Sequence, residues 1–580
     1  MSMAPPFTAQ GATLRSRTHL VADAVVLVAV AVLFWLLIRL SHGVNAPFNR
    51  GTAASSVSTD PSHLPYYAAR SLLRMFAALA VSTAFTLVYA TAAARLRRAE
   101  KLLLPVLDVL QSVPVLAFLS VTLSVWLTLF PHTMLGVECA CAFAIFTSQA
   151  WNMTFAFYQS LTTQPRELDE AARLLRLTRW QRFWTLDVPN GMIPLVWNGM
   201  MSFGGGWFFL VASEVISVNN HTYALPGIGS YVAAVTEHKQ VGRLLLAIGV
   251  MIVMVVGVNV VFWRPLTAWA ERFRAEDTAA AEVQRSVTLN LLRRSSLPAL
   301  VGNGLRPAAR VLDRVTRPFG LADYPLQVHP YRRRAGDVVF AAVVLGLIGW
   351  GVSRMLVYVG HGTGLGEFGH AFLLGLATFA RVLVLIVIGS AVWVPIGVWI
   401  GMNPKVTRYA QPVVQVLASF PANFLFPFVT LVLIHTGISL NIGGIVPMSL
   451  GAQWYILFNV IVGASAIPSD LREAATSLRM DRLLRWRTLI GPAIFSAWVT
   501  GGITAAGGAW NASIVAEVVS YGPHTLTATG LGAYISQSTA QGNFARTLVG
   551  VIVMSVYVVG LNRLFWRRLY RYAETRYSLT

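Results

Sequence analysis

The chain has 580 residues, of which 55% are hydrophobic and only 12% are charged, and its formal net charge is +21. A soluble domain carries about 25% charged residues, so this composition excludes an ordinary soluble protein and indicates a polytopic membrane protein. The basic residues cluster in loops beside apolar stretches. This pattern favours contact with anionic lipid and argues against nucleic-acid binding.

Apolar segments long enough to cross a membrane occur in two groups of six. A hydrocarbon core about 30 Å thick needs about 20 apolar residues per helix. The first group lies at roughly 20–40, 69–93, 103–130, 134–160, 190–217 and 241–263. The second lies at roughly 337–358, 370–402, 409–434, 441–463, 493–518 and 544–565. We therefore expect an all-α polytopic membrane protein with about 12 transmembrane helices. The segment at 20–40 is too long for a signal-peptide core, and we expect it to be a retained helix.

Loops that are rich in lysine and arginine alternate along the chain with loops that are poor in them. They gather before the first segment and between the second and third segments of each group: Arg15, Arg17, Arg95, Arg97, Arg98, Lys101, Lys405 and Arg408. The loops at 41–68 and 359–369 are poor in them. The positive-inside rule then predicts that both chain termini are cytoplasmic.

The two groups of segments are copies of one another. Several residues recur 303 positions apart (170 to 473): Glu170, Ala171, Ala172, Arg176, Pro189, Trp207, Glu214 and His221 correspond to Glu473, Ala474, Ala475, Arg479, Pro492, Trp510, Glu517 and His524. Others recur 307 apart (74 to 381): Arg74, Ser112 and Pro114 correspond to Arg381, Ser419 and Pro421. Each copy has an even number of segments, so both have the same orientation. A two-fold axis along the membrane normal, with a pathway between the copies, is expected.

The repeat divides the chain into three parts. We expect a first six-helix repeat at 1–268, a basic cytoplasmic linker at 269–335 and a second six-helix repeat at 336–580. The linker is polar and contains turn residues. It could lie on the membrane surface or against a partner protein, and the sequence leaves both open.

The duplicated Glu-Ala-Ala block lies in a short basic segment after the fourth apolar segment of each copy. This arrangement resembles the EAA loop of binding-protein-dependent ABC-transporter permeases. Ser112-Val113-Pro114, Gly205-Gly206-Trp207 and Ala212-Ser213-Glu214, with their counterparts, make the chain similar to a fused, duplicated nitrate/sulfonate/taurine-type anion permease. The family has glycine where this chain has Arg176 and Arg479, and both copies share this departure.

The resemblance implies a type I ABC importer permease fold with two parallel repeats, in a bacterial inner membrane. The chain would form the translocation pathway for a small solute, an anion of the nitrate, sulfonate/taurine or bicarbonate class. Two separate ABC ATPase subunits would dock on the EAA helices, and a periplasmic or lipid-anchored substrate-binding protein would deliver the solute. No glycine-rich phosphate loop ending in Lys-Ser/Thr occurs in the sequence. We therefore expect no enzymatic activity and no cofactor or metal on this chain, with ATP and Mg²⁺ bound by the partner ATPases.

The EAA residues carry the expected contact with the ATPases. Paired alanines permit close approach, and Glu170 and Glu473 supply a charge for a basic partner residue. Neighbouring arginines could pair with acids of the partner or hold lipid headgroups. Pro189 and Pro492 are expected to mark the end of each coupling helix before the next transmembrane segment.

The remaining repeated residues are candidates for a pathway or gate, and each has a structural alternative. Glu214 and Glu517 could act near the external side, or could hydrogen-bond the backbone of the following loop. Trp207 and Trp510 could narrow the pathway or serve apolar packing. His221 and His524 could contact substrate or its binding protein, or simply face solvent.

The repeated Ser–Pro pairs and the repeated arginines are further candidates, and two interpretations are open for the arginines. The Ser112–Pro114 and Ser419–Pro421 pairs should break a helix and free backbone groups to line a cavity. Arg74 and Arg381 could attract an anion at the outer side, or could snorkel to the interface.

Two other classes of function compete with an ABC importer. A gradient-driven secondary transporter with two six-helix halves shares the helix number and symmetry. It would not need duplicated cytoplasmic helices, and it would show more paired ionisable groups within the membrane than we expect here. A non-transporting scaffold leaves the matched Glu, Trp and His pairs unexplained.

Overall fold

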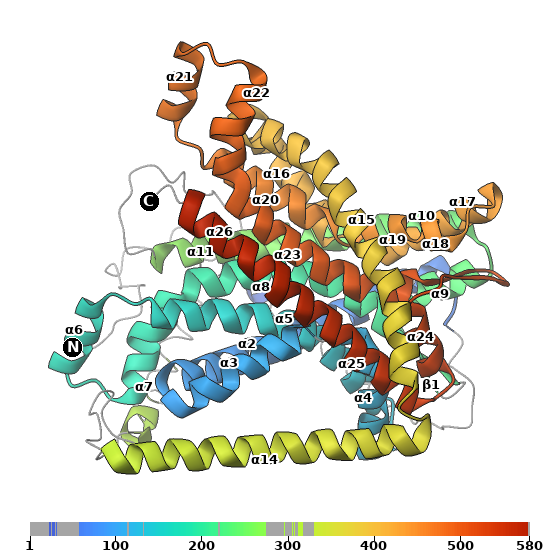
Figure 1. Ribbon diagram of the computed structural model, residues 1–580, viewed down its shortest axis with the longest axis horizontal. Helices are drawn as coiled ribbons and strands as arrows, with labels where there is room; N and C mark the ends of the chain where they lie inside the picture. Colours follow the sequence, from blue (N-terminus) through green and yellow to red (C-terminus); the bar gives the residue numbers. More distant parts are fainter. Residues whose placement is uncertain are drawn as a thin grey trace.

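The computed structural model describes residues 57–112, 115–131, 133–218, 221–273, 311–316 and 330–577, with isolated positions between 23 and 31 and between 295 and 307. Most of the segment at 20–40 and of the linker at 269–335 lies outside these residues. The described chain is almost entirely helical and forms two bundles of similar design (Figure 1).

The first half contains the following elements in chain order: η1 (Pro61–His63), α2 (Leu64–Arg95), α3 (Arg97–Ser112), α4 (Val115–Leu129), α5 (Leu135–Thr162), α6 (Arg166–Leu174), α7 (Arg179–Arg182), η2 (Phe183–Asp187), α8 (Val188–Ser213), β1 (Val215–Val218), β2 (His221–Ala224), α9 (Ile228–Glu237), α10 (Val241–Val258), η3 (Asn259–Trp263), α11 (Arg264–Ala270) and η4 (Glu271–Phe273).

The second half repeats this order: α14 (Pro330–Gly362), α15 (Glu367–Gly401), α16 (Pro404–Ser419), η6 (Ala422–Leu425), α17 (Phe426–Thr436), α18 (Leu440–Gly443), α19 (Ile445–Leu450), α20 (Gln453–Ser465), α21 (Ser469–Ser477), α22 (Arg482–Arg485), η7 (Trp486–Ile490), α23 (Gly491–Ala516), β3 (Val518–Tyr521), β4 (His524–Thr527), α24 (Leu531–Ala540), α25 (Phe544–Leu561), η8 (Asn562–Trp566) and α26 (Arg567–Tyr577). In each half the two short strands form an antiparallel hairpin.

The all-α membrane fold expected from the sequence is confirmed. Within the described residues, seven helices are long and apolar enough to cross a membrane, or up to nine if each of two bent pairs is one span. The expected number of 12 is not reached there.

One bent pair follows the Ser419–Pro421 motif. Helix α16 ends at Ser419, and the chain bends by 80° before continuing into α17. Proline disfavours a helical conformation in the residue before it, so the bend follows from the sequence. The corresponding residues 113–114 of the first half lie outside the described ones.

The fourth apolar segment differs between the halves. In the first half it is the single 28-residue helix α5, whereas the second half divides it into α18, α19 and α20, with a 43° bend. The fourth segment of the second half contains Gly444, Pro447 and Gly451. Glycine and proline both weaken a helix interior. The expectation of one helix at 441–463 was therefore wrong.

The halves interlock through their third and fifth segments. Helix α4 of the first half packs against α23, α24 and α25, and α16 of the second half packs against α8 and α10. Asn511 on α23 accepts a hydrogen bond of 3.0 Å from the backbone N–H of Val115. Asn423 donates one of 3.1 Å to the carbonyl of Phe208 on α8. Each broken third segment is thus bound to the fifth helix of the opposite half.

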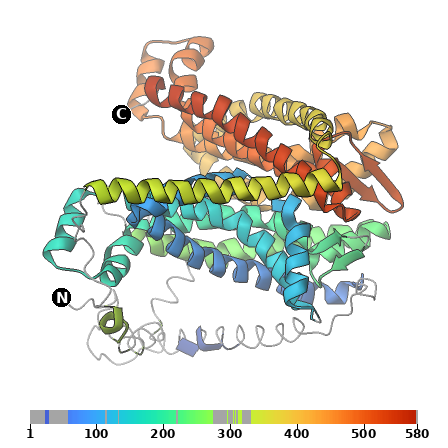
Figure 2. The ribbon, with the colours of Figure 1, turned by 60° about the horizontal axis from the view of Figure 1, so that its bottom comes forward.

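Helix α14 opens the second half but lies along the first one. Figure 2 shows the helix running along the first half. Asp337 near its start is 3.1 Å from the Nε of Arg98 and 3.8 Å from Lys101, both on α3. Its other end contacts α25. The helix therefore connects the halves on their outer surface, and its apolar side chains remain exposed, as expected of a lipid-facing helix.

Within the first half, α5 packs between α2 and α8. Glycine permits the closest approach: a Cβ atom added to Gly191 on α8 would lie 2.3 Å from the ring of Phe157 on α5. A Cβ atom added to Gly249 on α10 would have no atom of another described residue within 4 Å.

We predict that Gly191→Ala lowers the free energy of unfolding by about 1–3 kcal/mol, because the Phe157 ring must move within a packed core. Gly249→Ala serves as the matched control. It should raise stability by up to about 1 kcal/mol, because alanine is the better helix former. Thermal unfolding in detergent, followed by tryptophan fluorescence, measures both, and equal effects of the two variants would contradict this packing.

Candidate functional site

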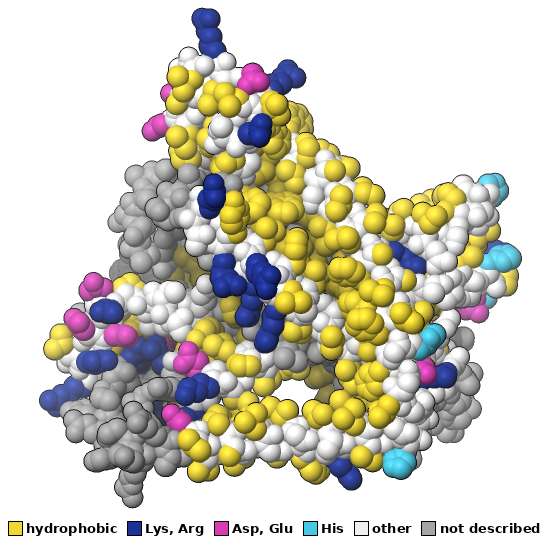
Figure 3. All heavy atoms as spheres, in the orientation of Figure 1, with side chains coloured by type: hydrophobic (Ala, Val, Ile, Leu, Met, Phe, Trp, Pro, Cys, Tyr) yellow, Lys and Arg dark blue, Asp and Glu magenta, His cyan; other side chains and the backbone are white. Residues whose placement is uncertain are grey.

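The two EAA segments (Arg166–Pro189 and Ser469–Pro492) project from one end of the molecule. Helices α6 and α21 stand away from the bundles in Figure 1. Charged side chains gather on them in Figure 3, whereas hydrophobic side chains cover much of the remaining face. Glu170 and Glu473 are exposed on these helices. Of each alanine pair, the first is exposed and the second, Ala172 or Ala475, is buried. The second alanine is covered by the rest of the protein, and the exposed residues remain available to a partner.

Arg176 and Arg479 occupy the turn after each projecting helix. Both have the left-handed backbone conformation, with φ of 46° and 48°. The backbone N–H of Leu177 bonds to the carbonyl of Ala172, and that of Met480 to the carbonyl of Ala475, which makes each turn a Schellman motif. Glycine adopts this conformation without strain. The glycine of the related family pattern thus has a conformational role, and both arginines occupy its place under strain.

The expectation that Pro189 and Pro492 end the coupling helices was wrong. The chain is continuously helical over Arg179–Ser213 and Arg482–Ala516, and each proline lies in the first turn of α8 or α23. A π-helical turn precedes each proline, η2 in the first half and η7 in the second. Such a turn changes the hydrogen-bond register where the proline N–H is missing. The actual breaks lie at the left-handed turns, and Thr178 and Asp481 cap the helices that follow.

Among the described residues, ion pairs hold the first EAA segment and not the second. Arg182 contacts Asp169 on α6 and lies 3.6 Å from Asp187, which also receives a hydrogen bond of 2.5 Å from Arg95. The equivalent positions in the second half hold Arg485, Arg472, Ile490 and Met402. There Arg472 donates only to the carbonyl of Met402, at 3.4 Å. The second EAA segment therefore lacks the carboxylates that fix the first.

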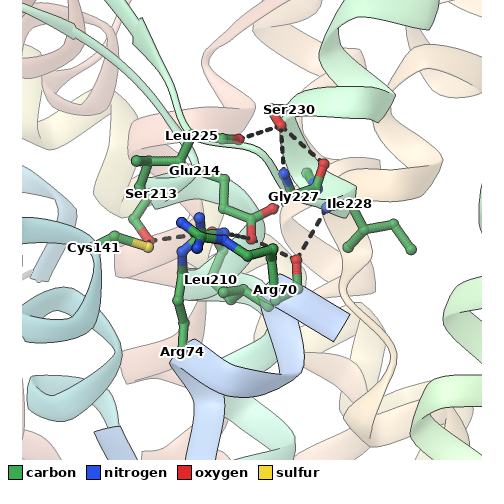
Figure 4. A network of polar contacts seen from close by, with 12 residues as sticks. Arg70, Arg74, Cys141, Leu210, Ser213, Glu214, Leu225, Gly227, Ile228 and Ser230 are labelled. Carbon is green, nitrogen blue, oxygen red and sulfur yellow. Dashed lines mark hydrogen bonds and ion pairs between the residues drawn. The ribbon is translucent and has the colours of Figure 1, made fainter. Parts of the chain in front are cut away.

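A buried polar network joins the fifth segment of the first half to α2 and α9 (Figure 4). The carboxylate of Glu214 is fully buried, and it accepts hydrogen bonds from Ser71 at 2.5 Å, Arg74 at 2.6 Å and the backbone N–H of Gly229 at 2.6 Å. Arg74 also bonds Glu138 on α5 at 2.6 Å, and Glu138 contacts Arg70. Two arginines and two carboxylates therefore neutralise one another, which a low-dielectric interior requires.

The second half contains a smaller version of this network. Fully buried Glu517 accepts hydrogen bonds from Thr378 at 2.8 Å, Arg381 at 2.7 Å and the backbone N–H of Ala533 at 3.0 Å. Arg381 also bonds the side chain of Asn441 at 3.0 Å. Asn441 occupies the position of Glu138, and Ala377 that of Arg70. One cation and one anion have been lost together, so both networks remain electrically neutral.

Each of the two repeated glutamates makes the backbone contact of the structural interpretation, because its carboxylate binds the backbone of the helix that follows its hairpin. The role of a gate stays a prediction. A Cβ atom on Gly227 would lie 2.2 Å from Glu214, and one on Gly530 would lie 2.3 Å from Glu517. The glycines therefore permit this contact. Arg74 and Arg381 are buried in ion pairs, so neither of the two roles weighed for them applies.

The expectation of few paired ionisable groups within the membrane was also wrong, since both halves contain such pairs. None of their members lines the two larger cavities between the halves, however. The pairs therefore hold the helices together and do not form a charged path.

Two of the larger cavities among the described residues lie between the halves. One of about 580 Å³ lies near the hairpins, and its lining includes Ile216, Asn423 and Thr525. The other, the central cavity, has a volume of about 460 Å³ and is lined mainly by α5, α8, α20, α23 and η8. All described residues that line the central cavity are uncharged.

Tyr455 on α20 borders the central cavity and a small cavity of about 50 Å³ beside it. Its hydroxyl group lies 3.3 Å from the Cβ position of Gly205, and its ring lies 3.4 Å from that of Gly508. These glycines are equivalent residues of α8 and α23. The tyrosine of one half thus lies between the fifth helices of both.

The pathway candidates are not brought together in one place. Trp510 lines the central cavity, whereas its counterpart Trp207 is buried and packs against Phe203. His524 is exposed on β4. Ser419 lies at the end of α16, 2.6 Å from the Cβ position of Gly204, and Pro421 is buried at the following bend. Pro114 and the side chains of Ser112 and His221 lie outside the described residues.

Sequence reasoning missed Glu138, Arg70, Tyr455 and Asn511. Glu138 and Arg70 have no like residue in the other half, so the search for repeats could not find them. Their joint replacement by Asn441 and Ala377 was the available signal, because a coupled loss of opposite charges indicates a contact. The positions of the first half equivalent to Tyr455 and Asn511 hold different residues, Asn152 and Phe208. A comparison of the two repeats therefore does not single them out.

We predict that Arg479→Gly stabilises the second EAA turn, because glycine adopts the left-handed conformation at a cost lower by about 1 kcal/mol. Arg479→Ala removes the same side chain but retains the Cβ atom, and it should give no such gain. Thermal unfolding of both variants in detergent tests this, and equal midpoints would show that the turn is not strained.

We predict that Glu138→Asn alone destabilises the first half by about 3–5 kcal/mol, because it leaves two buried arginines with one carboxylate. Adding Arg70→Ala recreates the arrangement of the second half, and most of the lost stability should return. The yield of monodisperse protein and its unfolding midpoint measure this coupling. A double variant no more stable than Glu138→Asn would contradict the charge balance.

Comparison with known proteins identifies the family. The family model of the binding-protein-dependent transport system inner membrane component matches residues 82–266 and 393–578, together more than half of the chain. The expected duplication is therefore confirmed.

Individual relatives resemble one part of the chain. The nitrate import permease protein NrtB of Leptolyngbya laminosa is 26% identical over 207 residues, which are 36% of this chain and 69% of that protein. The bicarbonate transport system permease protein CmpB of Synechococcus elongatus is 26% identical over 188 residues, 32% of this chain and 64% of that protein. The glycine betaine/proline betaine permease ProW of Escherichia coli is 25% identical over 142 residues, 24% of this chain and 38% of that protein. With a family match in each half, this chain belongs to the binding-protein-dependent transport system inner membrane components, a family of multi-pass ABC-transporter permeases.

Proposed function

We propose that this chain is the pathway-forming subunit of an ATP-driven importer for a small anion of the nitrate, sulfonate/taurine or bicarbonate class. The observation that carries the proposal is the pair of matched EAA helices at one end of two interlocked halves with a cavity between them. The anion class is supported by the likeness to the nitrate and bicarbonate permeases. The likeness to a betaine permease makes an uncharged or zwitterionic solute the alternative to test.

In this proposal two ABC ATPase subunits, which bind ATP and Mg²⁺, dock on α6 and α21. A periplasmic or lipid-anchored binding protein delivers the anion at the opposite end, where the hairpins lie. The protein is placed in a bacterial inner membrane with both termini cytoplasmic, supported by the basic loops beside the EAA helices.

The proposed transport mechanism follows from the way in which each EAA helix is joined to the fifth helix of its half. The left-handed turn at Arg176 or Arg479 joins α6 or α21 to a continuous helix that runs into α8 or α23. Movement of the docked ATPases would therefore be transmitted to the fifth helices, which line the central cavity. A rigid-body change of the two halves would open the cavity to alternate sides.

A gradient-driven transporter is not favoured, because the family match names a binding-protein-dependent system. The buried ion pairs, which such a transporter could use, do not line the central cavity in either half.

We predict that charge reversal at both Glu170 and Glu473 abolishes solute-stimulated ATPase activity while the protein remains folded. Both carboxylates are exposed, so stability should change by no more than about 0.5 kcal/mol. The matched control reverses Asp470, an exposed acid one turn from Glu473, and should retain coupling. Normal coupling in the double variant would rule out the assignment of these helices.

Purification from the native membrane in mild detergent tests the partners directly. Mass spectrometry should find a P-loop ATPase at about two copies per chain. Its absence under several mild conditions would contradict the proposed importer and would direct attention to ion-dependent uptake.

A further inference from the structure

We infer that the central cavity is a transient binding site for a monovalent oxyanion or sulfonate, and that it holds the anion by uncharged hydrogen-bond donors and not by a cationic side chain. The inference rests on the proposed anion import and adds how the pathway recognises its cargo. It is argued from the charges, the donors and the symmetry of the described residues.

The buried cations of the described membrane segments are already neutralised. Arg70 and Arg74 are paired with Glu138 and Glu214, and Arg381 is paired with Glu517. Withdrawing one of these arginines for a passing anion would leave a buried carboxylate without its partner, which is costly. The central cavity itself is lined by uncharged residues alone. An anion in it must therefore be held by neutral groups.

Donors without a partner gather around this cavity. The indole nitrogens of Trp151, Trp510 and Trp566 and the hydroxyl of Ser202 are buried, and they make no hydrogen bond within the described part of the chain. All four residues line the central cavity. An indole N–H can only donate, so three of these four groups can be satisfied only by an acceptor such as an anion or water.

Four buried polar groups without partners around one cavity need an explanation, because unpaired buried donors each cost about 1–3 kcal/mol. A transient acceptor supplies one. Small rotations of the indole rings when the halves move would let their N–H groups meet an anion in the cavity.

Neutral donors also define the charge of the ligand. The free-energy cost of removing an ion from water rises with the square of its charge. The interaction energy that each neutral donor contributes rises about in proportion to the charge. A dianion such as sulfate would therefore be excluded, and a monovalent anion would bind weakly enough to leave again, as a transport pathway requires. Nitrate, bicarbonate and a single sulfonate group each carry one negative charge.

The duplicated chain supplies a matched control. Trp566 and Trp263 are equivalent residues of the two halves, both buried, and each packs against the equivalent glycine, Gly502 or Gly199. Of the two, only Trp566 lines the central cavity. Its indole nitrogen is buried and makes no hydrogen bond within the described part of the chain. Trp566→Phe and Trp263→Phe thus remove the same N–H group in nearly the same packing, but only the first change alters the proposed site.

The experiment uses the complete complex with its ATPases in lipid nanodiscs, without the binding protein. Thermal stabilisation is titrated with sodium nitrate, bicarbonate, methanesulfonate and sulfate, because a ligand of the native state raises its stability with concentration. At least one monovalent anion should stabilise the complex and sulfate should not. The half-saturating concentration should rise about tenfold in Trp566→Phe and in Trp510→Phe, and should stay unchanged in Trp263→Phe.

Three results would overturn the inference: no stabilisation by any monovalent anion, equal half-saturation in Trp566→Phe and Trp263→Phe, or binding of sulfate as tight as that of the monovalent anions. Uptake by the complex with its binding protein in proteoliposomes separates these from failure of the proposed function. Anion uptake with unaltered half-saturation in the variants rejects only the neutral-donor site. Absence of ATP-driven anion uptake by the wild-type complex rejects the importer for anions itself.

Discussion

Each half of this protein depends on a carboxylate buried at the end of its fifth long helix. Glu214 and Glu517 have no exposed surface, so their charge must be balanced and their lone pairs filled by neighbouring groups. An arginine from the second segment, a hydroxyl from the same helix and a backbone N–H after the hairpin meet this need. One carboxylate thereby fixes three parts of the chain that are far apart in sequence, and the hairpin end of each bundle is fixed with them.

The two halves meet this constraint with different residues. The first uses two arginines and two glutamates, and the second replaces one of each by Ala377 and Asn441. A similar divergence affects the EAA segments, where Asp169 and Asp187 hold Arg182 in the first half, while Arg472 and Ile490 occupy their places in the second. The fused chain can differentiate its halves in this way, whereas two identical subunits cannot. The end that carries the ATPases in the proposed importer is therefore asymmetric before any partner binds.

The division of charge also explains how a strongly basic protein can have a central cavity whose described lining is uncharged. The excess positive charge lies in the loops, where it faces water and lipid headgroups. Arg70, Arg74 and Arg381, which lie inside the bundles, form ion pairs that hold helices together. The facing surfaces of the fifth helices carry Gly205, Gly508 and Asn511, and Tyr455 of α20 lies between them. All four residues are small or neutral. Such a lining allows an ion to pass without a deep electrostatic trap.

The sequence by itself determined the membrane class, the duplication and the two EAA segments, because apolar length and repeated spacing depend only on the order of residues. It also located the bend at Pro421, since proline acts on its neighbouring residue whatever surrounds it. It failed at Pro189 and Pro492, where a π-helical turn accommodates the proline, and at Arg74 and Arg381, whose partners come from other segments. The central cavity, the position of Tyr455 between the halves and the neutral charge balance of each network were decided by tertiary structure alone. Each depends on which side chains from distant segments meet in a low-dielectric interior, and the spacing of residues along the chain does not contain that information.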